Sequence, residues 1–237
     1  MRGYNFLAAV TLAIPVLSIA LAGRPGAEGQ AIREQSFGQA LSEAFAHRSY
    51  LLLTAGFFVC GFHVAFITAH LPAFIVDRGL DPRIGAWSLA LIGLFNVIGS
   101  LASGYIGQHY SKPIFLSFIY FSRAVAIALF VLLPVTPVTV LVFASTIGLL
   151  WLSTVPPTSG LVAIMFGPKY LGTLMGIVFF SHQVGAFLGV WLGGRLYDQT
   201  GSYDVVWWLG VALGIFAAIM HWPIQERPAY SAAAAAA

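Results

Sequence analysis

The chain has 237 residues, of which 59 % are hydrophobic and 8 % are charged. Soluble domains carry about 25 % charged residues, so a surface exposed mainly to water cannot be built from this composition. The composition excludes a soluble enzyme, a nucleic-acid-binding module and a disordered chain, and it predicts that lipid is the solvent for most of the protein. The formal net charge of +3 is then assigned to loops that face the cytoplasm.

Seven apolar segments are long enough to cross a bilayer, which takes about 20 helical residues. The alternating pattern of a transmembrane β-barrel is missing, so the predicted fold class is all-α, a polytopic membrane bundle of about seven helices. The predicted spans are 4–22, 50–76, 84–107, 114–133, 138–165, 171–194 and 204–222.

The first apolar segment, within 1–22, allows two interpretations. Met1 and Arg2 before an apolar run, with Ala-Leu-Ala at 20–22, are typical of a signal peptide with its cleavage site. The alternative is an ordinary spanning helix, with the loop 23–49 in the cytoplasm. That orientation places six Lys and Arg residues inside and four outside, a bias that favours the spanning helix.

Two segments outside the spans have their own character. The loop 23–49 begins with a linker that contains Gly and Pro and continues as an amphipathic helix, in which Ser36 and Gln39 fit a capping box. We expect this helix to lie on the membrane surface. The tail 226–237 ends in six alanines, and we expect it to be a low-complexity cytoplasmic segment.

Five consecutive spans carry a polar or amphipathic side chain near their middle. Such groups are costly in a membrane and usually face the bundle interior or a water-filled path, and transporters bind their substrates near the midplane. The sequence therefore predicts a substrate or proton pathway at this depth. The candidate pathway residues are His63, His70, Asn96, Arg123, Trp151, Ser153, His182 and Gln183.

The histidines among these residues suit proton coupling, because imidazole changes its charge near neutral pH. His63 and His70 are seven residues apart and therefore lie on one face of their helix. The alternative for each histidine is a neutral ring bonded to a neighbouring helix. Two histidines at this spacing supply too few ligands for a metal ion, so we predict no metal site and no other cofactor.

Arg123 is the only formal charge near the middle of a predicted span. A guanidinium at the bilayer centre costs at least about 2.5–3.5 kcal/mol on insertion scales. No Asp or Glu lies inside a predicted span except Asp204, at the first residue of the span 204–222, so carbonyls, water or an anionic solute must offset this cost. Arg123 is then either the receptor for an organic anion or a structural arginine bonded to helix carbonyls.

Small residues and prolines predict how the helices pack and bend. Glycines at every fourth position let two helix backbones approach closely. The predicted packing residues are Gly104, Gly185, Gly189 and Gly193. The pair Pro156-Pro157 removes two hydrogen-bond donors from the span 138–165 and predicts a bend there, with neighbouring hydroxyls bonding the freed carbonyls.

Three segments resemble transporters of the major facilitator superfamily, in their monocarboxylate and oxalate/formate porter branch. They are Phe57 to His63, Phe166 to Ile177 and Gly194 to Tyr203. The family has twelve helices in two six-helix halves, with the substrate between them. The resemblance implies that 1–22 holds the sixth helix, that 23–49 is the central cytoplasmic loop, and that 50–225 is the C-terminal half.

The sequence departs from the family pattern at two places. Gln108 stands where the family's loop motif has an Asp, and Ser111 where it has its second Gly. Asn96 and Ser100 occupy the positions of an Asp and an Arg that couple protons to anions in monocarboxylate porters. Proton coupling by that pair therefore cannot be transferred to this chain.

The leading hypothesis is a secondary active transporter of the cell membrane that moves a small organic solute, in particular a carboxylate, by alternating access. Its implied partners are the lipid bilayer, the solute, and a missing N-terminal half or a second copy of the chain. The alternative is a non-transporting membrane subunit or an inactive fragment of such a transporter. An enzyme is not predicted, since the sequence has no nucleotide loop, zincin pattern or nucleophile elbow.

Overall fold

The computed structural model describes residues 35–229, and all regular structure among them is helical, which confirms the all-α prediction. The predicted span 4–22, the start of the loop 23–49 and the end of the tail 226–237 lie outside the described residues. The described helices are α2 (Phe37–Ala46), α3 (Arg48–Asp77), α4 (Pro82–His109), α5 (Lys112–Leu132), α6 (Pro137–Leu150), α7 (Val155–Phe166), α8 (Leu171–Thr200) and α9 (Asp204–His221).

Six segments of the described region are long and apolar enough to cross a membrane. Five of them are the single helices α3, α4, α5, α8 and α9, and the sixth is formed by α6 and α7 together. They correspond to the last six predicted spans. The described part of the chain is therefore a six-span membrane bundle.

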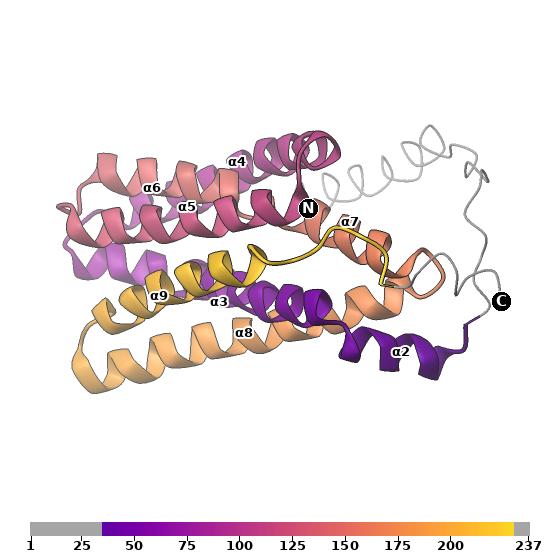
Figure 1. The fold of residues 1–237 in the computed structure, drawn as a ribbon. Coiled ribbons are helices and arrows are strands. Elements are labelled where there is room, and N and C mark those ends of the chain that lie inside the picture. Colours follow the sequence, from indigo (N-terminus) through magenta and orange to yellow (C-terminus); the bar gives the residue numbers. More distant parts are fainter. Residues whose placement is uncertain (1–34, 230–237) are drawn as a thin grey trace, which may run out of the picture. The chain divides into compact units, whose positions relative to one another are not determined.

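The bundle is organised in neighbouring helix pairs. The closest pairs are α3 with α8, α5 with α9, and α4 with α6, and α3 also packs against α9 and α4. Figure 1 shows α4, α5 and α6 along one side of the bundle and α3, α8 and α9 along the other. The α5–α9 pair and the contact between α3 and α4 join the two sides.

The helix boundaries follow from local sequence signals. Pro82, Pro113 and Pro137 each stand in the first turn of a helix, where the missing N–H would have no helical partner. The Asp81 side chain caps α4 by accepting a hydrogen bond from the Arg83 N–H at 2.8 Å. Gly201 ends α8 in the left-handed region, with φ of 68°.

Two predicted boundaries are wrong. The segment 195–203 is largely helical, because α8 continues to Thr200 before the chain turns. The span 138–165 is not one bent helix, because α6 ends at Leu150 and α7 begins at Val155. Pro156 and Pro157 lie in the first turn of α7, and the interruption falls in the four residues before it.

The helix predicted within 23–49 is present as α2. Its capping box is confirmed, because the Ser36 hydroxyl accepts from the Gln39 N–H at 3.3 Å and the Gln39 side chain accepts from the Ser36 N–H at 2.9 Å. The carbonyl of Gln35 accepts from Lys169 Nζ at 2.8 Å and from the Tyr170 hydroxyl at 2.9 Å. The start of α2 is thereby tied to the start of α8.

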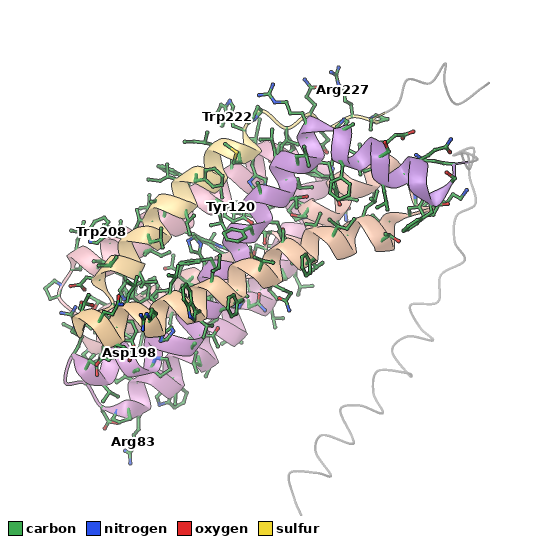
Figure 2. All side chains as sticks on the ribbon, turned by 90° about the horizontal axis from the view of Figure 1, so that it is seen from below. Arg83, Tyr120, Asp198, Trp208, Trp222 and Arg227 are labelled. Carbon is green, nitrogen blue, oxygen red and sulfur yellow. The ribbon has the colours of Figure 1, made fainter. Side chains whose placement is uncertain are left out.

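The C-terminal segment returns to the same end of the bundle. The Gln225 N–H donates to the Ser49 hydroxyl, and Lys112 pairs with Glu226 at 2.5 Å. His47, beside the start of α3, has a lowered pKa because of burial and the positive charge of Arg227. In Figure 2 the labelled Arg227 lies toward one end of the bundle, and Arg83 and Asp198 lie toward the other. Apart from the buried Arg123, the charges gather at the two ends of the bundle and leave an apolar middle, as a membrane requires.

Burial is uneven among the spans. In the most apolar stretch of each span, 56 % of the residues of α3 are buried, against 22 % for α4 and 28 % for α8. Large apolar side chains on these two helices are exposed, among them Leu101 on α4 and Phe180 on α8. Both helices therefore present an unpaired face to lipid or to another protein.

Candidate functional site

The most polar place in the membrane interior is the interruption between α6 and α7. Residues 151–154 do not continue the helix, so their backbone groups lose helical partners. Pro156 and Pro157 lack the N–H groups that would bond the carbonyls of Leu152 and Ser153 in a continuous helix. Because unbonded backbone groups are costly away from water, other parts of the bundle must bond them.

Three neighbouring side chains bond the backbone groups of the interruption. Arg123 on α5 donates through Nε to the Leu150 carbonyl at 3.0 Å and through Nη2 to the carbonyls of Leu150 and Trp151. The Asn96 side-chain oxygen on α4 accepts from the Leu152 N–H at 3.0 Å. The Ser103 hydroxyl, also on α4, donates to the carbonyl of Ser153. We call Asn96, Ser103 and Arg123, with residues 151–154, the break cluster.

Arg123 itself is 2 % exposed. Its guanidinium lies over the Tyr120 ring, 5.3 Å from the centroid, in a cation–π arrangement. The acidic residues of the six described spans, Asp77, Asp198 and Asp204, all lie close to a span end. Arg123 is therefore balanced by carbonyl dipoles and an aromatic face, the geometry of the structural alternative.

Trp151 and Ser153 belong to the break cluster itself. Both are buried, with exposed fractions of 9 % and 4 %. The Ser153 hydroxyl donates back to the Leu149 carbonyl at 2.5 Å, which bonds one more carbonyl at the end of α6. These two candidate pathway residues therefore contact other helices of this chain rather than an open face.

The three candidate histidines lie in different surroundings. His63 is buried, and its Nε2 donates to the Gly210 carbonyl of α9 at 2.8 Å. His70 lies nearer the end of α3, where its Nε2 donates to the Val190 carbonyl of α8 at 3.0 Å. Both rings bond a backbone carbonyl of a neighbouring helix, and the structure does not bring them together with His182.

His182 lies beside the exposed face of α8. Its ring is half-buried between Phe57 and Phe179, with centroid distances of 5.3 and 6.1 Å. Its Nδ1 donates to the side-chain oxygen of Gln183 at 3.1 Å, and Gln183 is exposed. His182 and Gln183 are therefore the predicted pathway residues that a solute beside α8 can reach.

Three predicted packing glycines lie against α3. A Cβ on Gly185 would overlap the Phe58 carbonyl, and one on Gly193 would overlap the His70 ring. A Cβ on Gly189 would lie 2.5 Å from the Phe62 carbonyl oxygen. A Cβ on Gly104 would meet no atom within 4 Å, so Gly104 is not a site of close approach within the described residues. α3 and α8 pack backbone to backbone along this glycine face.

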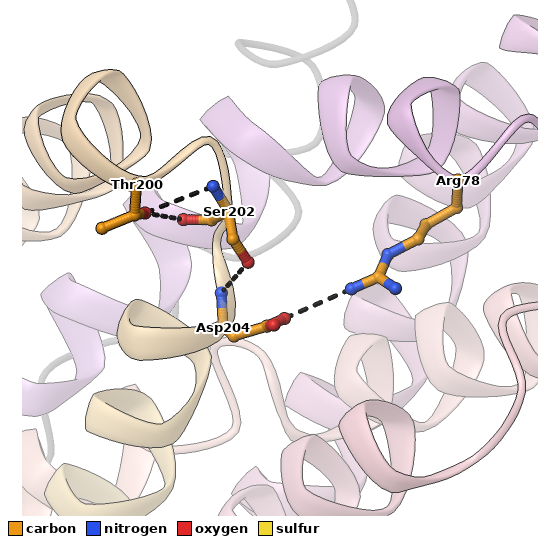
Figure 3. A network of polar contacts seen from close by, with 4 residues as sticks. All are labelled: Arg78, Thr200, Ser202 and Asp204. Carbon is orange, nitrogen blue, oxygen red and sulfur yellow. Dashed lines mark hydrogen bonds and ion pairs between the residues drawn. The ribbon is translucent and has the colours of Figure 1, made fainter.

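Several groups at the site carry no signal in the sequence. Ser103 is a hydroxyl in an apolar run, and Cys60 is a lone cysteine, with its Sγ 3.4 Å from the hydroxyl of Thr154, which follows Ser153. At the far end of the bundle, Arg78 pairs with Asp204 across 126 residues at 3.2 Å, as Figure 3 shows. Only the packing of distant helices reveals these partners.

The fold and this site define a class of protein before any comparison. Six apolar helices, an interrupted helix bonded by buried polar side chains and two unpaired helix faces are features of a polytopic membrane transport protein. Among residues 35–229, no group of three or more His, Cys, Asp and Glu side chains could hold a metal ion.

Comparison with known proteins gives the family. The family model of the Major Facilitator Superfamily matches residues 3–189, and the chain belongs to this family of transporters. An uncharacterized MFS-type transporter, YcxA of Bacillus subtilis, is 27 % identical over 215 residues, which cover 86 % of this chain and 51 % of YcxA. Monocarboxylate transporter 13 of Rattus norvegicus is 27 % identical over 145 residues, or 60 % of this chain and 33 % of the relative. The chain spans about half the length of YcxA and a smaller share of the length of the other relatives.

The membership confirms the family resemblance and the multi-pass membrane location. It places the chain in a family of transporters rather than in a family of enzymes, with the lipid bilayer as its surroundings.

Proposed function

We propose that this chain acts as the C-terminal half of a secondary active transporter that moves a small carboxylate by alternating access. Three relatives are named monocarboxylate transporters, from Rattus norvegicus, Bos taurus and Danio rerio, which supports an organic anion as the solute. The uneven burial of the spans supports a second half as the partner, because α4 and α8 each leave one face unpaired. That partner is a separate N-terminal half or a second copy of this chain.

The observation that carries this proposal is the position of His182 and Gln183. They lie near the middle of α8, where the His182 ring is half-buried against Phe57 of α3 and the neighbouring Gln183 is exposed. A solute held between two halves would meet a neutral imidazole and an amide, both able to bond a carboxylate. Arg123 cannot serve there in this arrangement, since two of its nitrogens already bond the α6–α7 interruption.

The test is uptake of radiolabelled lactate and oxalate by vesicles that contain this chain, with and without a co-expressed N-terminal half. We expect uptake only when both halves are present. Uptake by this chain alone would point to a second copy as the partner. Failure of all combinations to transport would support the non-transporting subunit.

The orientation of the bundle is part of this proposal. Ser36 lies at the start of α2 beside the start of α8, whereas Ser202 follows the end of α8, a helix of 30 residues or about 45 Å. We expect cysteines introduced at Ser36 and Ser202, in a Cys60→Ser background, to react with an impermeant thiol reagent from the cytoplasmic and outer sides respectively. Labelling of both from one side would contradict this topology.

A further inference from the structure

Five helices or connections send a hydrogen-bonding side chain into the same part of the core. Cys60 comes from α3, Tyr120 from α5, Thr154 from the α6–α7 interruption, His182 from α8 and His221 from α9. Four of them have no exposed surface, and only His182 is half-buried. The family match accounts for none of them individually.

These side chains form a continuous series. His182 lies beside Cys60. The Cys60 thiol is 3.4 Å from the Thr154 hydroxyl. The Tyr120 hydroxyl lies near both Thr154 and Cys60, and the Tyr120 ring stacks on His221 with centroids 4.8 Å apart. The series therefore leads from the exposed face of α8, through the core, to the last residue of α9.

The same region holds buried polar atoms that lack a direct partner. Among residues 35–229, these include the Tyr120 hydroxyl, Arg123 Nη1, the Thr158 hydroxyl and His221 Nε2. Their side chains are at most 2 % exposed. Buried polar atoms are bonded in stable proteins, and polar groups that face one another without a direct bond are commonly bridged by water. The groups of the series are thus placed to share water.

We propose that His182, Cys60, Thr154, Tyr120 and His221, bridged by water, form a proton relay between the exposed face of α8 and the end of α9. The inference rests on the proposed function and names the proton as the coupling ion.

The hydrogen-bond directions fit such a relay. His182 Nδ1 donates to Gln183, so Nε2 of the neutral ring is the atom that can accept a proton. His221 Nδ1 donates to the Ala217 carbonyl at 2.7 Å, which likewise leaves Nε2 as an acceptor. In each transfer a group accepts one proton from one neighbour and passes one to the next. The S–H and O–H bonds that break are replaced by equivalent ones, and one proton moves in total.

Arg123 is the fixed charge along this route. Its positive charge lies near Cys60, His182 and Tyr120, and also near His63 of α3. Besides Arg123, the groups next to His182 are Cys60 and Gln183. Those next to Tyr120 are Cys60, Thr154 and His221. A nearby positive charge disfavours a group that has taken up an extra proton and favours a group that has lost one. Cys60, Thr154 and Tyr120 therefore each give up a proton as they accept one, so that no extra positive charge rests on them beside Arg123.

The test uses vesicles with both halves, radiolabelled lactate and a trapped pH-sensitive dye. We expect Tyr120→Phe to abolish lactate-driven proton uptake while lactate exchange continues, because phenylalanine keeps the ring beside Arg123 and His221 but removes the hydroxyl. Cys60→Ala should have the same effect, and Cys60→Ser should restore proton uptake. The control is Tyr50→Phe, which removes a buried hydroxyl bonded to the Leu174 carbonyl at 2.9 Å, away from the series.

The outcomes separate the two proposals. Proton uptake at the wild-type ratio in both Tyr120→Phe and Cys60→Ala would overturn the relay and leave the transporter proposal intact. Equal loss of lactate exchange and proton uptake in these variants would also overturn it, since their role would then be structural. Absence of any lactate or oxalate transport by the wild-type halves would overturn the transporter proposal and the relay together.

Discussion

Replacing Arg123 with alanine should lower the folded abundance of the protein more than any other single substitution of a polar residue. The change frees the carbonyls of Leu150 and Trp151, which lie inside the membrane at the interruption between α6 and α7. Hydrogen bonds to charged groups contribute about 1.5–3 kcal/mol each, and a buried acceptor left unbonded adds its own penalty. The loss should therefore exceed about 3 kcal/mol. It is measured as the midpoint of thermal unfolding in detergent and as the monodisperse yield.

A matched variant separates the charge from the geometry. Arg123→Lys keeps a cation but has a single donor nitrogen in place of the planar fork that bonds the two carbonyls, so we expect an intermediate yield. Arg195→Ala, at an exposed arginine of α8, should change neither yield nor midpoint. If Arg123→Ala is stably folded but does not transport in the assembled protein, the arginine is the anion receptor, and the structural role assigned to it here is wrong.

Gly189→Leu should prevent α3 and α8 from packing. A Cβ added at this position would lie 2.5 Å from the Phe62 carbonyl oxygen and 3.2 Å from the Phe62 carbonyl carbon. Both neighbours are backbone atoms of a long helix, so they cannot move aside as a side chain would. Overpacking costs about 1–3 kcal/mol in ordinary cores, and backbone contact places this site at or above that range. The measurement is the yield of folded protein after membrane extraction.

The control for this variant is on the same helix. Gly176→Leu adds the same side chain where a Cβ would meet no atom within 4 Å. It should leave the folded yield unchanged, and Leu188→Val beside Gly189 should lower the yield less than Gly189→Leu does. Equal tolerance of leucine at Gly176 and Gly189 would mean that the glycine face of α8 is incidental to packing.

Much of the fold could be predicted because a membrane imposes strict local rules. A span must be about 20 apolar residues long and helical, since lipid offers no hydrogen bonds to the backbone. The last six predicted spans are therefore present, and prolines and capping residues mark several of their starts. The segments that resembled the major facilitator superfamily also identified the family correctly.

The bonds of the polar groups could not be predicted in the same way. Midspan position singled out His63, Arg123 and His182 as equivalent, but the structure gives them different surroundings. His63 bonds a carbonyl of α9, Arg123 bonds the end of α6, and His182 reaches an exposed face. Which partner each side chain meets depends on the rotation of its helix against the neighbouring helices. The apolar pattern of a membrane helix hardly determines that rotation.

The sequence by itself determined the class of the protein, its spans and its family, because hydropathy and local motifs are properties of single segments. Only the tertiary structure decided where α6 and α7 separate and which side chains bond the interruption. Asn96 and Ser103 reach residues 152 and 153 from α4, and Arg123 reaches the same place from α5. The physical reason is that a backbone group freed inside lipid bonds whichever donor the neighbouring helices bring to it, and that choice is made by helix packing.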